Sequence, residues 1–162
     1  MLAQWKKRIA TLSAAALLAM SAGTVLAQGH SHSHETGQPG QLAFNDGKKW
    51  ATDESLREAM SRIRGAMTAA LPTIHKATAE QYRALARSTN DQIAFIVKNC
   101  KLDEKADAML HLVLADIIAG ADAMMAHSGS DARKGAEKIM HALDNYGVYF
   151  DHPGWQGEMP GH

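Results

Sequence analysis

Histidine residues cluster near the start of the chain, in the run His30-Ser31-His32-Ser33-His34. Imidazole nitrogens are ligands for copper, zinc and nickel ions. In a chain that begins at Gln28, the α-amine, the next two amide nitrogens and the His30 imidazole can surround Cu(II) or Ni(II) in a square plane. Cyclisation of Gln28 would remove that amine. The first candidate metal site is therefore His30, His32 and His34, with copper the favoured ion and zinc or nickel as alternatives.

The residues before this run have the order of a cleavable export signal. A short basic stretch precedes an apolar one at 9–20, and residues 24–27 supply a small-residue cleavage pattern. Cleavage after Ala27 would place the histidine-rich segment at the new N-terminus. We therefore expect a periplasmic protein with a signal peptide at 1–27. Residues 28–49, which are poor in apolar side chains, are expected to form a flexible leader.

Composition limits the classes of partner. Removing 27 of the 162 residues leaves 135, enough for one domain, with 14 Lys and Arg against 17 Asp and Glu. This slight acidity does not indicate nucleic-acid binding. Charged residues interrupt every later apolar stretch, so we expect no membrane span after signal cleavage. The single cysteine, Cys100, cannot form an intramolecular disulfide, so it is either buried or bonds a metal or a partner, as in a homodimer.

Four segments with apolar residues at helical spacing follow the leader. Short connections between segments of this length favour an all-α, antiparallel up-down-up-down four-helix bundle over residues 50–155. Residues 156–162 are then a C-terminal tail, and the aromatic residues of 150–155 are expected to fold back over one end. The four helices are predicted at about 53–71, 78–100, 104–126 and 131–149.

Several residues mark where these helices begin and end. Thr52 is the predicted N-cap of the first helix, and Pro72 is expected to end it. Thr78 and Gln81 match a capping box at the start of the second. Asp103 is the predicted cap of the third.

The expected topology gathers the other ligand-type side chains at the two ends of the bundle. Cys100 and His152 are expected at one end, where a thiolate and an imidazole would suit zinc or copper. His75, Met124 and His127 are expected at the other, as a candidate soft-metal site. The alternative at both ends is structural, since methionine and cysteine pack well in cores and histidines in turns are solvated.

Residue patterns typical of catalysis are absent from the sequence. It contains no His-Glu-x-x-His, no Gly-x-Ser-x-Gly, no phosphate-binding glycine loop and no Cys-x-x-Cys-His. Cys100 and His152 could form a nucleophile and base, but no third group to orient the histidine is evident. We therefore expect a protein that is not an enzyme.

The chain from about 53 to 150 resembles the soluble b-type cytochromes and cytochromes c′, which are small periplasmic four-helix-bundle proteins. The resemblance rests on the export signal, the number and length of the helices, and Leu56-Arg57-Glu58-Ala59-Met60. This segment is similar to the first helix of the b-type members, in which a methionine ligates haem, so the resemblance implies Met60 as a cofactor ligand. The family's histidine near the end of the fourth helix has no counterpart in Asn145–Tyr149. Haem is therefore not favoured.

Three classes of function remain. The leading one is periplasmic copper binding for buffering, delivery or resistance, supported by the leader histidines and the seven methionines left after cleavage. The second is electron transfer through haem held by Met60 with His111 or His152. The third is a structural module that docks a protein partner through the surface around Trp50 and Trp155, or that dimerises.

Overall fold

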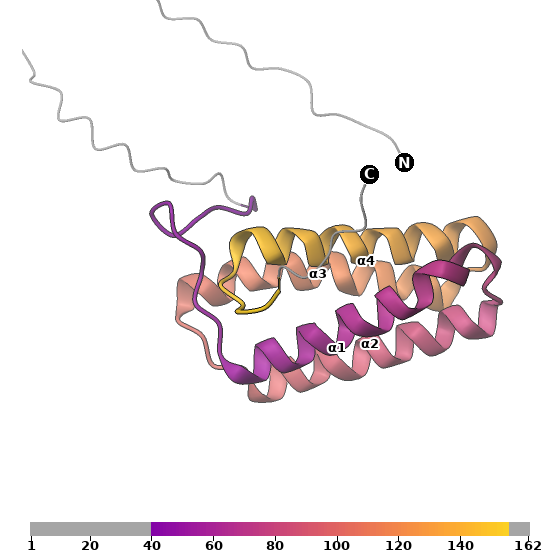
Figure 1. Cartoon of the computed structure of the whole chain (residues 1–162), viewed down its shortest axis with the longest axis horizontal. Coiled ribbons are helices and arrows are strands. Elements are labelled where there is room, and N and C mark those ends of the chain that lie inside the picture. Colours follow the sequence, from indigo (N-terminus) through magenta and orange to yellow (C-terminus); the bar gives the residue numbers. More distant parts are fainter. Residues whose placement is uncertain (1–39, 156–162) are drawn as a thin grey trace, which may run out of the picture. The chain divides into compact units, whose positions relative to one another are not determined.

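The structure is a computed structural model and describes residues 40–155. This part of the chain forms four α-helices and one 3-10 helix, with two isolated β-bridges and no strands. Successive helices run in opposite directions and lie side by side (Figure 1). The predicted all-α four-helix bundle is confirmed. The elements are α1 (Glu54–Ala70), η1 (Leu71–Lys76), α2 (Ala79–Asn99), α3 (Glu104–Ala126) and α4 (Gly129–Tyr149).

The start of α1 differs from the prediction by one residue. Asp53 is the N-cap, and its Oδ1 accepts the backbone N–H of Leu56 at 2.7 Å. The Thr52 hydroxyl instead donates to the backbone carbonyl of Asp151, 2.5 Å away. The prediction that Thr52 is the N-cap was therefore wrong, because its hydroxyl group is hydrogen-bonded to a residue distant in sequence. The predicted capping box of α2 and the predicted aspartate cap of α3 are confirmed.

The end of α1 is shaped by Pro72, as predicted. The α-helix stops at Ala70, and the chain tightens into η1 with the proline in its first turn, where a missing N–H is tolerated. The Tyr82 hydroxyl donates to the carbonyl of Ile74 at 2.6 Å and so ties η1 to α2.

The core lies between the apolar faces of the four helices. Helix α3 supplies eight buried residues and packs against both α2 and α4. By length and composition alone it could also cross a membrane, as apolar core helices of soluble bundles often can. Met125 is 36% exposed, whereas the preceding Met124 is completely buried. The largest fully buried side chains are Tyr82, Tyr146, Phe150, Leu56, Met60, Ile63, Met67, Leu110, Ile117, Met124, Ile139 and Leu143.

Helices α3 and α4 touch backbone to backbone at two glycines. A Cβ on Gly120 would lie 2.5 Å from the Gly135 carbonyl oxygen, and one on Gly135 would lie 2.6 Å from the Gly120 oxygen. No real Cβ fits at such distances, so this crossing requires glycine on both helices.

The two ends of the described chain are joined beside the start of α1. The Trp50 N–H donates to the Tyr149 carbonyl, and the Asp151 N–H donates to the Trp50 carbonyl, both at 2.8 Å. The Trp50 indole N–H donates to the Ala43 carbonyl at 2.7 Å. The last part of the predicted leader, 42–49, therefore contacts the bundle. The predicted signal peptide and the histidine-rich segment lie outside the described residues.

Candidate functional site

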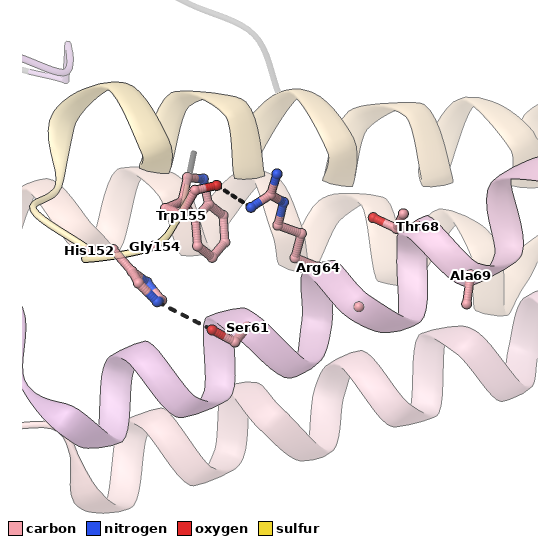
Figure 2. A pocket seen from close by; sticks show the side chains of 8 residues that line it. Ser61, Arg64, Thr68, Ala69, His152, Gly154 and Trp155 are labelled. Carbon is pink, nitrogen blue, oxygen red and sulfur yellow. Dashed lines mark hydrogen bonds between the residues drawn. The ribbon is translucent and has the colours of Figure 1, made fainter. Parts of the chain in front are cut away.

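The predicted fold-back of the chain end is confirmed, and it places His152 between two helices. We call residues Phe150–Trp155 the C-terminal strap. The Nδ1 atom of His152 is 3.1 Å from the phenol oxygen of Tyr146, on α4. The Nε2 atom of His152 is 3.2 Å from the Ser61 Oγ, on α1 (Figure 2). The Trp155 ring lies against both His152 and Tyr146, with ring centroids 4.7 Å apart in each case.

The buried Tyr146 phenol sets the direction of these hydrogen bonds. Burial raises the pKa of Tyr146, which therefore stays protonated, and His152 is its hydrogen-bond partner among the described residues. A buried O–H without an acceptor is costly, so the phenol donates to Nδ1. A neutral imidazole with an accepting Nδ1 carries its hydrogen on Nε2, which then donates to the Ser61 oxygen. The hydrogen bonds thus share one direction, because Tyr146 donates to His152 and His152 donates to Ser61.

The surroundings of His152 favour this neutral form. Burial, followed by the positive charges of Arg57 and Arg64, lowers the pKa of His152 below its ordinary value of 6.5. A general base acting on a serine needs an unprotonated nitrogen facing the hydroxyl. Here the nitrogen that faces Ser61 carries the hydrogen, so this arrangement does not activate Ser61 as a nucleophile.

An open groove of about 510 Å³ lies beside this chain of hydrogen bonds. Helix α1 forms one wall and the C-terminal strap forms the other (Figure 2). The Arg64 guanidinium lies 4.8 Å from the centroid of the Trp155 ring and donates to the Trp155 carbonyl. None of the described residues that line the groove is Asp or Glu. The polar and aromatic lining residues are Ser61, Arg64, Thr68, His152 and Trp155.

Cys100 lies at the same end of the bundle as His152 but has different surroundings. It is partly buried at the C-cap of α2. Burial, followed by the neighbouring Asp53 carboxylate, raises the pKa of the Cys100 thiol to about 12. A metal-binding cysteine must lose its proton, which these surroundings oppose. Both ring nitrogens of His152 already have hydrogen-bond partners.

The candidate metal ligands predicted at the other end of the bundle differ in how far they are buried. His75, in η1, and His127, at the C-cap of α3, are exposed. Met124 is completely buried in the core, as is Met60, the residue that the cytochrome resemblance singles out. Within residues 40–155, no group of three or more His, Cys, Asp or Glu could hold a metal ion. The leader candidates His30, His32 and His34 lie outside that range.

The groove is the feature that the sequence analysis missed. Ser61, Arg64 and Thr68 lie on the polar side of α1, and the helical pattern assigns such positions to solvent. Their spacing of three and four residues places them on one face, which is a signal the sequence does carry. The second wall could not be inferred, because it depends on how the strap returns over α1.

The fold defines the chain as an all-α, antiparallel four-helix bundle. No protein-family model, curated protein or solved structure matches the chain. We therefore argue its function from its own residues.

Proposed function

We propose that the protein is a non-catalytic periplasmic metal-binding protein that holds copper through His30, His32 and His34 and serves to buffer or deliver the ion. The observation that carries the proposal is the spacing of these three histidines, at alternate positions directly after a predicted signal-cleavage site. Imidazole, amine and amide nitrogens suit Cu(II) in a square plane.

The surroundings of the bundle candidates support assigning copper to the leader. Met60 and Met124 are completely buried in the core. The raised pKa of Cys100 keeps its thiol protonated near pH 7. His152 uses both ring nitrogens in hydrogen bonds. In this proposal the bundle is a stable carrier, and the leader is the part that binds the ion.

A Cu(II) titration of the processed protein, followed by calorimetry against a competing chelator, tests the proposal. In the leader variant, His30, His32 and His34 are all changed to Ala. We expect its Cu(II) affinity to fall by at least about tenfold, which corresponds to about 1.4 kcal/mol of binding free energy. Unchanged affinity would contradict the proposal.

A matched control removes the same number of imidazoles from the bundle. His75, His127 and His141 are exposed on described elements, and all three are changed to Ala. This variant should bind Cu(II) within about twofold of the unaltered protein, less than 1 kcal/mol apart. An affinity loss in the control as large as in the leader variant would place the ion on the bundle surface instead.

Copper binding should also weaken in acid. An unperturbed imidazole titrates near pH 6.5, and only the neutral form binds metal. We therefore expect the Cu(II) affinity of the unaltered protein to fall as the pH drops through about 6. Calorimetric titrations on both sides of that pH measure the change. An affinity that is constant across this range would show that imidazoles are not the main ligands.

A further inference from the structure

Helix α3 exposes a mostly apolar face that neither the bundle core nor the metal proposal uses. We propose that this face binds a second copy of the chain, with the two α3 helices packed antiparallel about a two-fold axis. The face lies on the bundle and not on the leader, so this inference and the copper proposal can fail independently.

The composition of α3 sets it apart from the other three helices. It is the most apolar of the four, and its apolar residues are distributed around the whole helix. A helix that is apolar on all sides is usually buried on all sides. Here, however, only 39% of its most apolar stretch is buried inside the bundle. Helix α3 therefore has more apolar surface than its contacts with α2 and α4 cover.

The exposed residues of this face form two neighbouring columns, each with a seven-residue repeat. Residues seven apart lie at nearly the same angle on a helix, so each column is a row along α3. We call these six exposed residues the α3 face. The first column is Ala108, Ala115 and Asp122, and the second is His111, Ile118 and Met125.

An antiparallel second copy matches these columns by size. In a two-fold pair, a contact between two positions occurs twice, once in each direction. An axis between positions 116 and 117 of α3 places Ile118 opposite Ala115 of the second copy. The same axis places Met125 opposite Ala108 of the second copy. Each large exposed side chain thus faces a small one, which allows two helices to pack closely.

Charge complementarity selects the same register. His111 and Asp122 are the ionisable members of the α3 face. The axis that pairs large with small residues also places His111 of each copy opposite Asp122 of the other. The His111 Nδ1 atom is 2.8 Å from the Asp107 carbonyl oxygen in its own helix, which leaves Nε2 for a second copy. A parallel pair would instead bring the two Asp122 carboxylates together, so we infer the antiparallel arrangement.

The size of the α3 face predicts a weak dimer. From Ala108 to Met125 it is about 26 Å long, at about 1.5 Å per residue. Stable complexes bury about 800 Å² per partner, and one helix face of this length supplies roughly half of that. We therefore expect a dissociation constant of about 10–100 µM.

Analytical ultracentrifugation of the processed protein, at about 5 to about 500 µM, tests the proposal. The protein is kept reduced, so that Cys100 cannot link two copies. We expect a reversible equilibrium between monomer and dimer. A chain that is monomeric at every concentration would overturn the proposal. Binding of a monomeric chain to phosphatidylcholine vesicles, lost in Ile118→Glu, would also overturn it and assign the face to a membrane.

A matched pair of variants tests whether the α3 face is the interface. Ile118→Glu places a carboxylate near the two-fold axis and should weaken dimerisation by at least about tenfold. Val97→Glu makes a similar change on α2, at a side chain that is 77% exposed and outside the α3 face. It should change the dissociation constant by less than about twofold. Unaltered dimerisation in a folded Ile118→Glu variant, or equal losses in both, would contradict the interface.

Charge reversal tests the register. His111→Glu puts a carboxylate opposite Asp122 of the second copy and should weaken the dimer by at least about threefold. Adding Asp122→Lys restores opposite charges and should return the dissociation constant to within about twofold of its original value. Both residues are exposed, so these changes leave the core intact. A double variant that dimerises as weakly as His111→Glu alone would contradict the antiparallel pairing.

Discussion

At the scale of single residues, the folded structure disfavours protonation of His152. A proton on Nδ1 would face the Tyr146 phenol, which would then have to turn its own hydrogen away. Burial and the charges of Arg57 and Arg64 lower the pKa of His152 in the folded protein below its unfolded value. The unfolded chain therefore binds more protons between these two pKa values. It follows that the free energy of unfolding decreases as the pH falls below about 6.5.

Changing His152 to Gln should remove this pH dependence. The variant has no imidazole to protonate, so its stability should change less between about pH 7.5 and about pH 5.5 than that of the unaltered protein. Urea unfolding at both pH values, followed by tryptophan fluorescence, measures the difference. His141→Gln, which removes an exposed imidazole from α4, is the control. If both variants keep the full pH dependence, His152 is not its source.

Gly147 is required where the strap docks. A Cβ at Gly147 would overlap the Trp155 indole ring. We expect Gly147→Ala to displace Trp155, lower the free energy of unfolding by about 1–3 kcal/mol and shift the tryptophan emission to the red. Gly65→Ala should instead stabilise the protein by about 0.5–1 kcal/mol, because its Cβ meets nothing. Denaturant unfolding of both variants checks the contrast, and a neutral Gly147→Ala would refute the tight docking.

At the scale of elements, Asp53 joins the start of α1 to the α2–α3 connection. Its Oδ1 accepts from Leu56, and its Oδ2 accepts the backbone N–H of Lys101 at 2.6 Å. Asp103 only caps its own helix, α3. Asp103→Ala should therefore cost about 1 kcal/mol, and Asp53→Ala about 1 kcal/mol more. Thermal unfolding of the two variants tests this, and equal losses would mean that the Lys101 contact adds nothing.

The helices also show which structural features can be predicted from the sequence. Apolar spacing and local caps determine helix boundaries, and the prediction was accurate where a cap depends on residues three positions apart, as with Thr78 and Gln81. The prediction failed at Thr52, because the carbonyl of Asp151 takes its hydroxyl. The groove was missed for the same reason, since one of its walls is formed by residues distant in sequence. No local pattern predicts such contacts.

At the scale of the whole molecule, hydrogen bonds hold the two ends of the described chain next to each other. Backbone hydrogen bonds connect Trp50 to the start of the strap. The Lys49 ammonium group adds another hydrogen bond by donating to the Gly147 carbonyl at 2.6 Å. These contacts show that residues 42–49, the last part of the expected leader, lie against the bundle. Residues 42–44 are apolar and 45–49 are polar or glycine, and the Ala43 carbonyl and the Phe44 ring contact Trp50 and Tyr149.

The proposal that the leader histidines hold copper predicts a thermal result. A ligand raises the melting temperature only when it binds the folded state more tightly than the unfolded one. Copper held by the leader should bind both states similarly, so Cu(II) should leave the Tm nearly unchanged. Differential scanning calorimetry with and without Cu(II) measures this. A Tm increase that grows with Cu(II) concentration would place the ion inside the folded bundle.

The most direct test of the account is the metal content of the untagged protein after export to a periplasm in copper-supplemented medium. Mass spectrometry gives the bound metal, absorbance detects haem, and N-terminal sequencing of the same sample locates the cleavage site. We predict near-stoichiometric copper, no haem absorbance and a chain that begins at Gln28. A metal-free protein, or a haem-containing one, would contradict copper binding as the function.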